Sequence, residues 1–140
     1  MNGRFFLDTN IFVYSFDSDA PAKAHRARQL IRQAIATRKG IISFQVAQEF
    51  FNVALQHFRT PMSFSEAHQY LTTVFRPLLA VHSTLGLYGD ALQLKERYRF
   101  SWCDALIVAA AIEAQCDILY SEDLRHGQRI GDMQVENPFL

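Results

Sequence analysis

The sequence lacks the features that mark several large classes of protein. It has two cysteines in 140 residues and a net charge of zero. No apolar run approaches the roughly 20 residues that a membrane-spanning helix needs, and the first residues are too briefly apolar for a signal peptide. Glycine patterns typical of P-loops and dinucleotide sites are missing, as is a G-x-S-x-G nucleophile elbow. We therefore expect a cytoplasmic protein that does not associate with membranes.

The scarce cysteines and histidines also limit the chemistry. Cys103 and Cys116 fall on one predicted helix, about 20 Å apart, which is too far for a disulfide. We expect both to be reduced, half-buried packing residues, as is usual in the cytoplasm. The five histidines show no H-E-x-x-H spacing, which argues against a zinc site. Because the net charge is zero, any contact with nucleic acid depends on local basic patches.

What the sequence does contain is a large apolar fraction, 49%, with twelve phenylalanines. That is enough for one buried core, and we expect a single domain spanning residues 1–140. The strand-like runs cover residues 4–7, 41–43, 78–82, 118–120 and 133–135, and the helix-like runs cover residues 11–16, 22–38, 44–58, 63–76, 84–98 and 102–115. This alternation predicts a three-layer α/β/α fold with a mainly parallel central sheet of four to five strands.

In the helix predicted for residues 44–58, apolar side chains recur at helical spacing. We expect one face of this helix to be buried. That face carries Phe44, Ala47, Phe51, Ala54, Leu55 and Phe58.

Four acidic residues, far apart in the sequence, are predicted to lie at one edge of the sheet. Asp8 and Asp123 directly follow strands, whereas Glu49 and Asp104 lie in the first turns of helices. Helices in such folds run antiparallel to the strands, so all four positions fall at the carboxyl edge, where open α/β sheets bind ligands. Four clustered carboxylates repel one another unless a cation lies between them. The sequence therefore predicts a divalent-metal site.

Two of the acids have a competing role as helix caps. Asp8 could cap the helix that follows it, although Thr9 or Asn10 could do so instead and leave Asp8 free for metal. Asp104 and Ser101 fit a capping box. Asp104 is nevertheless the only polar side chain from Cys103 to Ile112, and this composition predicts a buried helix. A carboxylate accepts several hydrogen bonds, so capping and metal binding are compatible.

The other two acids also have simpler readings. Glu49 could belong to a solvated helix face, since polar side chains share its arc. Phe50 and Phe51 follow it directly, however, and no Lys or Arg appears until Arg59. Asp123 could serve a turn or a cap after the fourth strand.

Four arginines are candidates for RNA contacts. Arg97 and Arg99 alternate with aromatic residues, as in stacking platforms for single strands, although basic residues at a helix end are also favoured by the helix dipole. Arg125 and Arg129 follow Asp123 and could contact phosphates or belong to a solvated loop.

Taken together and in order, four segments resemble the PIN domain family. Asp8-Thr9-Asn10 resembles its opening motif, and Glu49 within residues 48–52 resembles its second acid. Asp104 within residues 102–107 resembles the third, and Asp123 within residues 121–124 the fourth, followed by a glycine and a terminal Asn-Pro-Phe. The resemblance covers essentially the whole chain. The short length is similar to that of VapC-type toxins of bacterial toxin–antitoxin pairs.

For that family, the resemblance implies an endoribonuclease that uses Mg²⁺ or Mn²⁺, forms a homodimer, cleaves RNA and is inhibited by a cognate antitoxin protein. Mg²⁺ prefers hard oxygen ligands, which here would be Asp8, Asp104 and Asp123. Glu49 would hold a second ion or orient a water, which completes the catalytic set of four acids. The side chains that would hold carboxylates and waters in place are Thr9, Asn10 and Ser121.

Other functions remain open. A phosphoacceptor signalling domain would need paired acids after the first strand and a lysine after the last, and a HAD-type phosphatase would need Asp-x-Asp where this chain has Asp8-Thr9-Asn10. Within the PIN family, the alternatives are an RNA-processing nuclease outside a toxin pair and a binding module without catalysis. Loss of one or more acids would indicate the binding module, and none is missing.

Overall fold

Six strands form one central sheet in the order β3-β2-β1-β4-β6-β5. The computed structural model describes residues 1–140. The strands are β1 (Phe5–Leu7), β2 (Gly40–Ser43), β3 (Leu79–Val81), β4 (Ile118–Tyr120), β5 (Arg129–Ile130) and β6 (Met133–Glu136). All neighbouring strands are parallel except β5, which is antiparallel to β6. The prediction of a mainly parallel sheet is confirmed, with β5 as a short addition.

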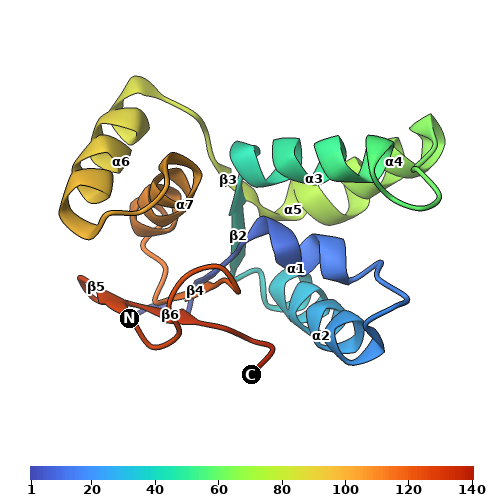
Figure 1. Cartoon of the computed structure of the whole chain (residues 1–140), viewed down its shortest axis with the longest axis horizontal. Coiled ribbons are helices and arrows are strands. Elements are labelled where there is room, and N and C mark those ends of the chain that lie inside the picture. The colour runs from blue at the N-terminus through green and yellow to red at the C-terminus, as the bar shows by residue number, and fades with distance from the viewer.

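The helices pack on both sides of this sheet. They are α1 (Thr9–Tyr14), α2 (Pro21–Thr37), α3 (Phe44–Gln56), α4 (Phe64–Tyr70), the π-helical turn η1 (Leu71–Phe75), α5 (Arg76–Leu78), α6 (Leu85–Tyr98) and α7 (Trp102–Glu113). In Figure 1, α6 and α7 lie on one side of the strands and α1 and α2 on the other, and both α7 and α2 contact β2. The predicted three-layer α/β/α arrangement is confirmed. None of the helices has the length and apolar character needed to span a bilayer.

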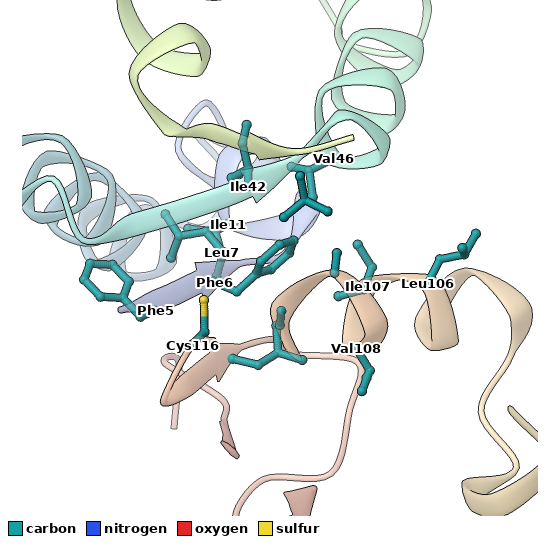
Figure 2. Close-up of a cluster of buried hydrophobic side chains, with 14 of the residues drawn as sticks. Phe5, Phe6, Leu7, Ile11, Ile42, Val46, Leu106, Ile107, Val108 and Cys116 are labelled. Carbon is teal, nitrogen blue, oxygen red and sulfur yellow. The ribbon is translucent and has the colours of Figure 1, made fainter. Parts of the chain in front are cut away.

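The core is built around the central strand β1. Phe6 and Leu7 are fully buried, as is Ile42 on β2. Figure 2 shows the β1 side chains among those of β2, α3 and α7, where Val46 and Ile107 belong to the same buried cluster. Burial on both faces of β1 fixes the strand, and this fixes the position of the residue that follows it, Asp8.

The expected buried face of α3 is partly wrong. Phe44 and Leu55 are each 44% exposed, whereas Val46 and Phe50, which the expected face omitted, are fully buried. The Phe50 ring stacks on Tyr70 at 5.0 Å between centroids and meets Phe75 edge-on at 5.3 Å. These aromatic contacts with the last residues of α4 and η1 turn the helix so that Phe44, directly after β2, stays at the surface.

The cysteines also differ from expectation. α7 ends at Glu113, so Cys116 lies beyond the helix. Cys116 is buried and Cys103 is exposed, rather than both being half-buried, and both are free thiols.

Candidate functional site

A cavity of about 290 Å³ brings the four predicted acids together. Its ten lining residues are Asp8, Thr9, Asn10, Val13, Glu49, Val53, Cys103, Asp104, Ile107 and Asp123. They come from the end of β1, the first turns of α1, α3 and α7, and the loop after β4. The carboxyl edge of the sheet therefore holds a cavity that four carboxylates share.

Local structure explains how each acid reaches this cavity. The backbone N–H of Asp8 donates to the carbonyl of Tyr120 at 3.1 Å, so the sheet continues to the residue that carries the first carboxylate. Ser121 and Asp123 follow β4 at the neighbouring position. Glu49 is the sixth residue of α3, and Asp104 is the third residue of α7. Each helix thus begins at the same edge and directs an early side chain into the cavity.

Three polar side chains each orient a different acid. The Thr9 hydroxyl donates to Oε1 of Glu49 at 2.9 Å, and the Asn10 amide donates to Oδ2 of Asp123 at 3.1 Å. The Ser121 hydroxyl donates to Oδ2 of Asp8 at 2.8 Å. These are the three residues for which the sequence predicted a supporting role. Hydrogen bonds of this kind fix the direction in which a carboxylate presents its remaining lone pairs.

The two acids with a predicted capping role differ from each other. Oδ1 of Asp8 accepts a hydrogen bond from the Thr9 backbone at 2.7 Å, so Asp8 itself caps α1. Of the alternatives that the sequence left open for this helix, the structure shows capping by Asp8 and not by Thr9 or Asn10. At α7, the Ser101 hydroxyl accepts from the backbone N–H of Asp104 at 3.1 Å. The Asp104 carboxylate makes no return bond, so its two oxygens are left for the cavity.

No basic side chain neutralises this group of acids. The chain has two ion pairs, Lys23 with Glu122 and Arg59 with Asp19, and neither involves a cavity acid. Burial raises the pKa of Asp8 to about 7, while hydrogen bonds from Ser121 and Thr9 lower it and the charges of Asp123 and Glu49 raise it further. Burial, followed by the charge of Asp104, also raises the pKa of Asp123. The cavity thus holds negative charge at a cost that a bound cation would relieve.

The donor set fits a hard divalent cation. Four carboxylates line the cavity and all of its charged ligand atoms are oxygens, which Mg²⁺ and Mn²⁺ prefer. No three of the histidine, cysteine or acidic side chains lie close enough together to form a finished coordination group. Because Mg²⁺ keeps several waters and takes few protein ligands, a widely spaced set of carboxylates is compatible with it.

The raised pKa of Asp8 predicts how stability without metal depends on pH. In the unfolded chain this carboxyl titrates near its ordinary value of 3.8, and in the folded chain near 7. The folded state therefore binds more protons between these values, and stability falls as pH rises from about 4 to 7. Asp8→Asn removes the titration and keeps a capping side chain. We expect its advantage in unfolding free energy to grow across this window by up to about 4 kcal/mol.

Urea denaturation in EDTA, at several pH values between about 4 and 8, would measure this difference between Asp8→Asn and the parent. A difference that does not change with pH would contradict the raised pKa. An Asn variant less stable than the parent at neutral pH would show that the hydrogen bonds the carboxylate accepts from Thr9 and Ser121 stabilise the folded chain by more than burial of the charge costs.

The four arginines are not brought into the cavity. Arg97 and Arg129 line a separate cavity of about 780 Å³ that shares no residue with the first. That cavity also includes Asn2 and Asp117, which precede β1 and β4, so it lies at the opposite edge of the sheet. The other two arginines, Arg99 and Arg125, are exposed and line neither cavity. Glu122, beside Asp123, bonds Lys23 and Tyr14, each at 2.5 Å, and stays outside the acidic cavity.

The apolar wall of the cavity was not predicted from the sequence. Val13, Val53 and Ile107 line it together with the acids. Val53 follows Glu49 by four residues and Ile107 follows Asp104 by three, so each apolar side chain lies on the same helix face as its acid. This spacing could have identified them. Apolar walls beside carboxylates limit solvent and strengthen electrostatic interactions in the cavity.

The model of the PIN domain family matches residues 5–130, which is most of the chain and includes all four cavity acids. The chain belongs to the PIN domain family. No curated protein matches this PIN domain by sequence.

Several solved structures share the fold of this PIN domain. A toxin–antitoxin complex from Klebsiella pneumoniae is 16% identical, with a TM-score of 0.68 over 95% of this chain and 96% of that one. FitAB bound to the IR36 DNA fragment is 13% identical, with a TM-score of 0.72 over 97% and 96% of the two chains. VapC20 from Mycobacterium tuberculosis, described as a sarcin–ricin loop cleaving toxin, is 18% identical, with a TM-score of 0.59 over 85% and 89%. At these identities the likeness establishes the common fold.

Proposed function

We propose that this PIN domain is an endoribonuclease that hydrolyses RNA phosphodiester bonds with Mg²⁺ or Mn²⁺. The observation that carries the proposal is the cavity lined by Asp8, Glu49, Asp104 and Asp123 with no basic side chain to neutralise them. A bound divalent cation would activate water and offset the charge on the phosphate.

The protein's own residues would divide this work. Asp8, Asp104 and Asp123 would hold the cation, and Asp104 is the acid whose carboxylate has no competing hydrogen bond. Glu49, held by Thr9 at 2.9 Å, would orient the attacking water or hold a second ion. Ser121 and Asn10 would keep their carboxylates turned toward the cation. With these side chains already positioned, little reorganisation would be needed when RNA binds.

RNA as the substrate, and a toxin as the biological role, are supported by the shared fold. Similar structures include toxin–antitoxin complexes and one toxin described as cleaving the sarcin–ricin loop. We propose that this chain is likewise the toxin of such a pair, with a cognate antitoxin as its protein partner and the cytoplasm as its location.

We also propose a homodimer. One face of α6 carries exposed apolar side chains, with Leu85 at 91%, Tyr88 at 43% and Leu92 at 60% exposure. These positions are three and four residues apart, so they form one stripe. A second copy of the chain would cover it. Light scattering should report a dimer for the parent and a monomer for Leu92→Glu, and a monomeric parent would refute this part of the proposal.

The direct test of the proposed function is metal-dependent cleavage. Purified protein should cut RNA in Mg²⁺ or Mn²⁺ and stop when EDTA is added, because the carboxylates alone supply no positive charge to the phosphate. Restoring excess Mg²⁺ should restore cleavage. Since saturating Mg²⁺ binds only the folded state, it should also raise the melting temperature, and less so for Asp8→Asn. Cleavage that EDTA leaves undiminished would refute the metal requirement.

Two alternatives within the family remain distinguishable. An RNA-processing nuclease outside a toxin pair would show the same metal-dependent cleavage without growth arrest. A binding module would bind RNA without cleaving it. The intact set of four carboxylates favours the nuclease over the binding module.

A further inference from the structure

The carboxyl edge of the sheet changes in character from one side to the other. The residues that directly follow the strands, in the spatial order β3-β2-β1-β4, are His82, Phe44, Asp8 and Ser121. Asp8, after β1, lines the acidic cavity, and Ser121, after β4, donates a hydrogen bond to it. The two residues after β2 and β3 carry aromatic rings. An acidic half and an aromatic half therefore share one edge, and Figure 1 shows α3 starting beside β2 and β3.

The two rings at this edge form an exposed stack. The centroids of Phe44 and His82 are 4.7 Å apart and their planes differ by 32°. Phe44 is 44% exposed, and His82 is also exposed. A solvent-facing aromatic pair next to a cavity is a surface on which a flat ring can stack.

Beside the stack lies a small apolar groove with one positive charge at its rim. The groove has a volume of about 320 Å³, and its lining residues are Phe44, Leu71, Thr72, Arg76 and Leu79. Arg76 takes part in neither of the two ion pairs of the chain. The aromatic ring and the apolar walls match the face of a nucleobase, and the guanidinium, which forms no ion pair, matches a phosphate.

The aromatic half is connected directly to the acidic half. Phe44 follows β2 and Asp8 follows β1, and these two strands are neighbours in the sheet. Neighbouring strands lie about 5 Å apart. In addition, the side-chain amide of Gln45 donates to the carbonyl of Cys103 at 3.2 Å. The residue after Phe44 is thus bonded to the residue before Asp104. An RNA strand lying across the acidic cavity would reach the Phe44 and His82 rings within one or two strand spacings.

We propose that Phe44 and His82 stack an unpaired nucleobase of the RNA strand whose phosphate lies in the acidic cavity, with Arg76 facing an adjoining phosphate. The inference rests on the proposed ribonuclease function and deepens it, because it makes the substrate single-stranded beside the cut bond. A base in a duplex is already stacked on its neighbours and cannot present its face to the protein. The site reads a base face rather than a base edge, so it tolerates different bases at this position.

The test is RNA affinity in a background that cannot cleave. Asp104→Asn protein is titrated into a short, fluorescently labelled single-stranded RNA, and anisotropy gives Kd. Adding Phe44→Ala should weaken binding roughly tenfold or more, the usual effect of removing one stacking ring. The matched control is Phe64→Ala, since Phe64 is 84% exposed on α4 and lines neither the groove nor the acidic cavity. This control should bind as the parent does.

Two further comparisons separate stacking from bulk and from misfolding. Phe44→Trp should keep the affinity and Phe44→Leu should lose it, because leucine supplies apolar volume without a ring face. An RNA with an abasic residue next to the cut bond should bind the parent and Phe44→Ala equally. If Phe44→Ala fails to fold, the Trp and Leu variants decide the question.

The stacking site and the ribonuclease proposal can be refuted separately. Equal RNA affinity and equal KM for the parent, Phe44→Ala and Phe44→Leu, with cleavage intact, would overturn the stacking site and leave the ribonuclease proposal standing. A parent protein that neither binds nor cuts RNA would overturn both. A dimer that Phe44→Ala converts to a monomer, with unchanged affinity for RNA, would assign this face to a second copy instead.

Discussion

Asp104→Asn should lower RNA cleavage by at least about a hundredfold while leaving the fold intact. The carboxylate makes no hydrogen bond in the structure, so its loss removes charge from the cavity without breaking a structural contact. The α7 cap is unaffected, because it uses the backbone N–H of Asp104 and the Ser101 hydroxyl at 3.1 Å. Weaker binding of a cation that stabilises charge in the transition state raises the activation free energy by several kcal/mol. Each factor of ten in rate corresponds to about 1.4 kcal/mol.

Asp90→Asn is the matched control for this variant. Asp90 lies exposed on α6 and does not line the acidic cavity, so its replacement also removes one helical carboxylate without touching the proposed site. Initial rates of cleavage in Mg²⁺, together with melting curves, would compare the two variants with the parent. An Asp104→Asn protein that cuts RNA at the parental rate would reduce Asp104 to a helix-start residue.

Much of this fold could be predicted because its elements carry strong local signals. β1 is uniformly apolar, and α7 is apolar except for Asp104 and Glu113, which is typical of elements buried in an α/β fold. β5 was not predicted, because its two residues, Arg129 and Ile130, are too few to show the alternation of polar and apolar side chains that marks a strand. It forms only because β6 offers a free edge after the turn at Gly131, whose φ of +62° favours glycine.

The orientation of a helix was harder to predict than its existence. Phe44 and Leu55 lie on an arc of α3 that helical spacing alone makes a credible buried face. The buried arc is instead set by Phe50, which packs against Tyr70 and Phe75 from a distant segment. Contacts of this kind depend on tertiary packing, which a single sequence does not contain.

At the candidate site, the sequence placed the acids well because strand ends and helix starts share one edge. It could not place the arginines. Arg97 ends α6, and Arg129 lies in β5, so both fall at the opposite edge from the acids. Nearness in sequence to Asp123 or Trp102 does not place them beside the acids, since one helix or strand is enough to carry a residue across the sheet. Whether these arginines contact RNA stays a prediction.

The second large effect expected is on growing cells. If the chain is the toxin of a pair, inducing it alone should arrest growth, because a ribonuclease without its inhibitor degrades RNA that the cell needs. The Asp104→Asn protein, expressed to the same level, should be harmless, and Asp90→Asn should arrest growth as the parent does. Growth curves and colony counts after induction would measure this, and sequencing of RNA ends would identify the cut sites.

Co-expression of a small protein encoded beside the gene should restore growth. Such an inhibitor would place an Arg or Lys among Asp8, Asp104 and Asp123, replacing the charge of the cation with charge-assisted hydrogen bonds. Its affinity should therefore fall with Asp104→Asn and with excess Mg²⁺, which competes for the same carboxylates. A parent chain that is harmless at high expression and that no neighbouring protein binds would end the toxin assignment. The ribonuclease proposal would survive that result, because it depends on the four carboxylates of the cavity and not on a partner.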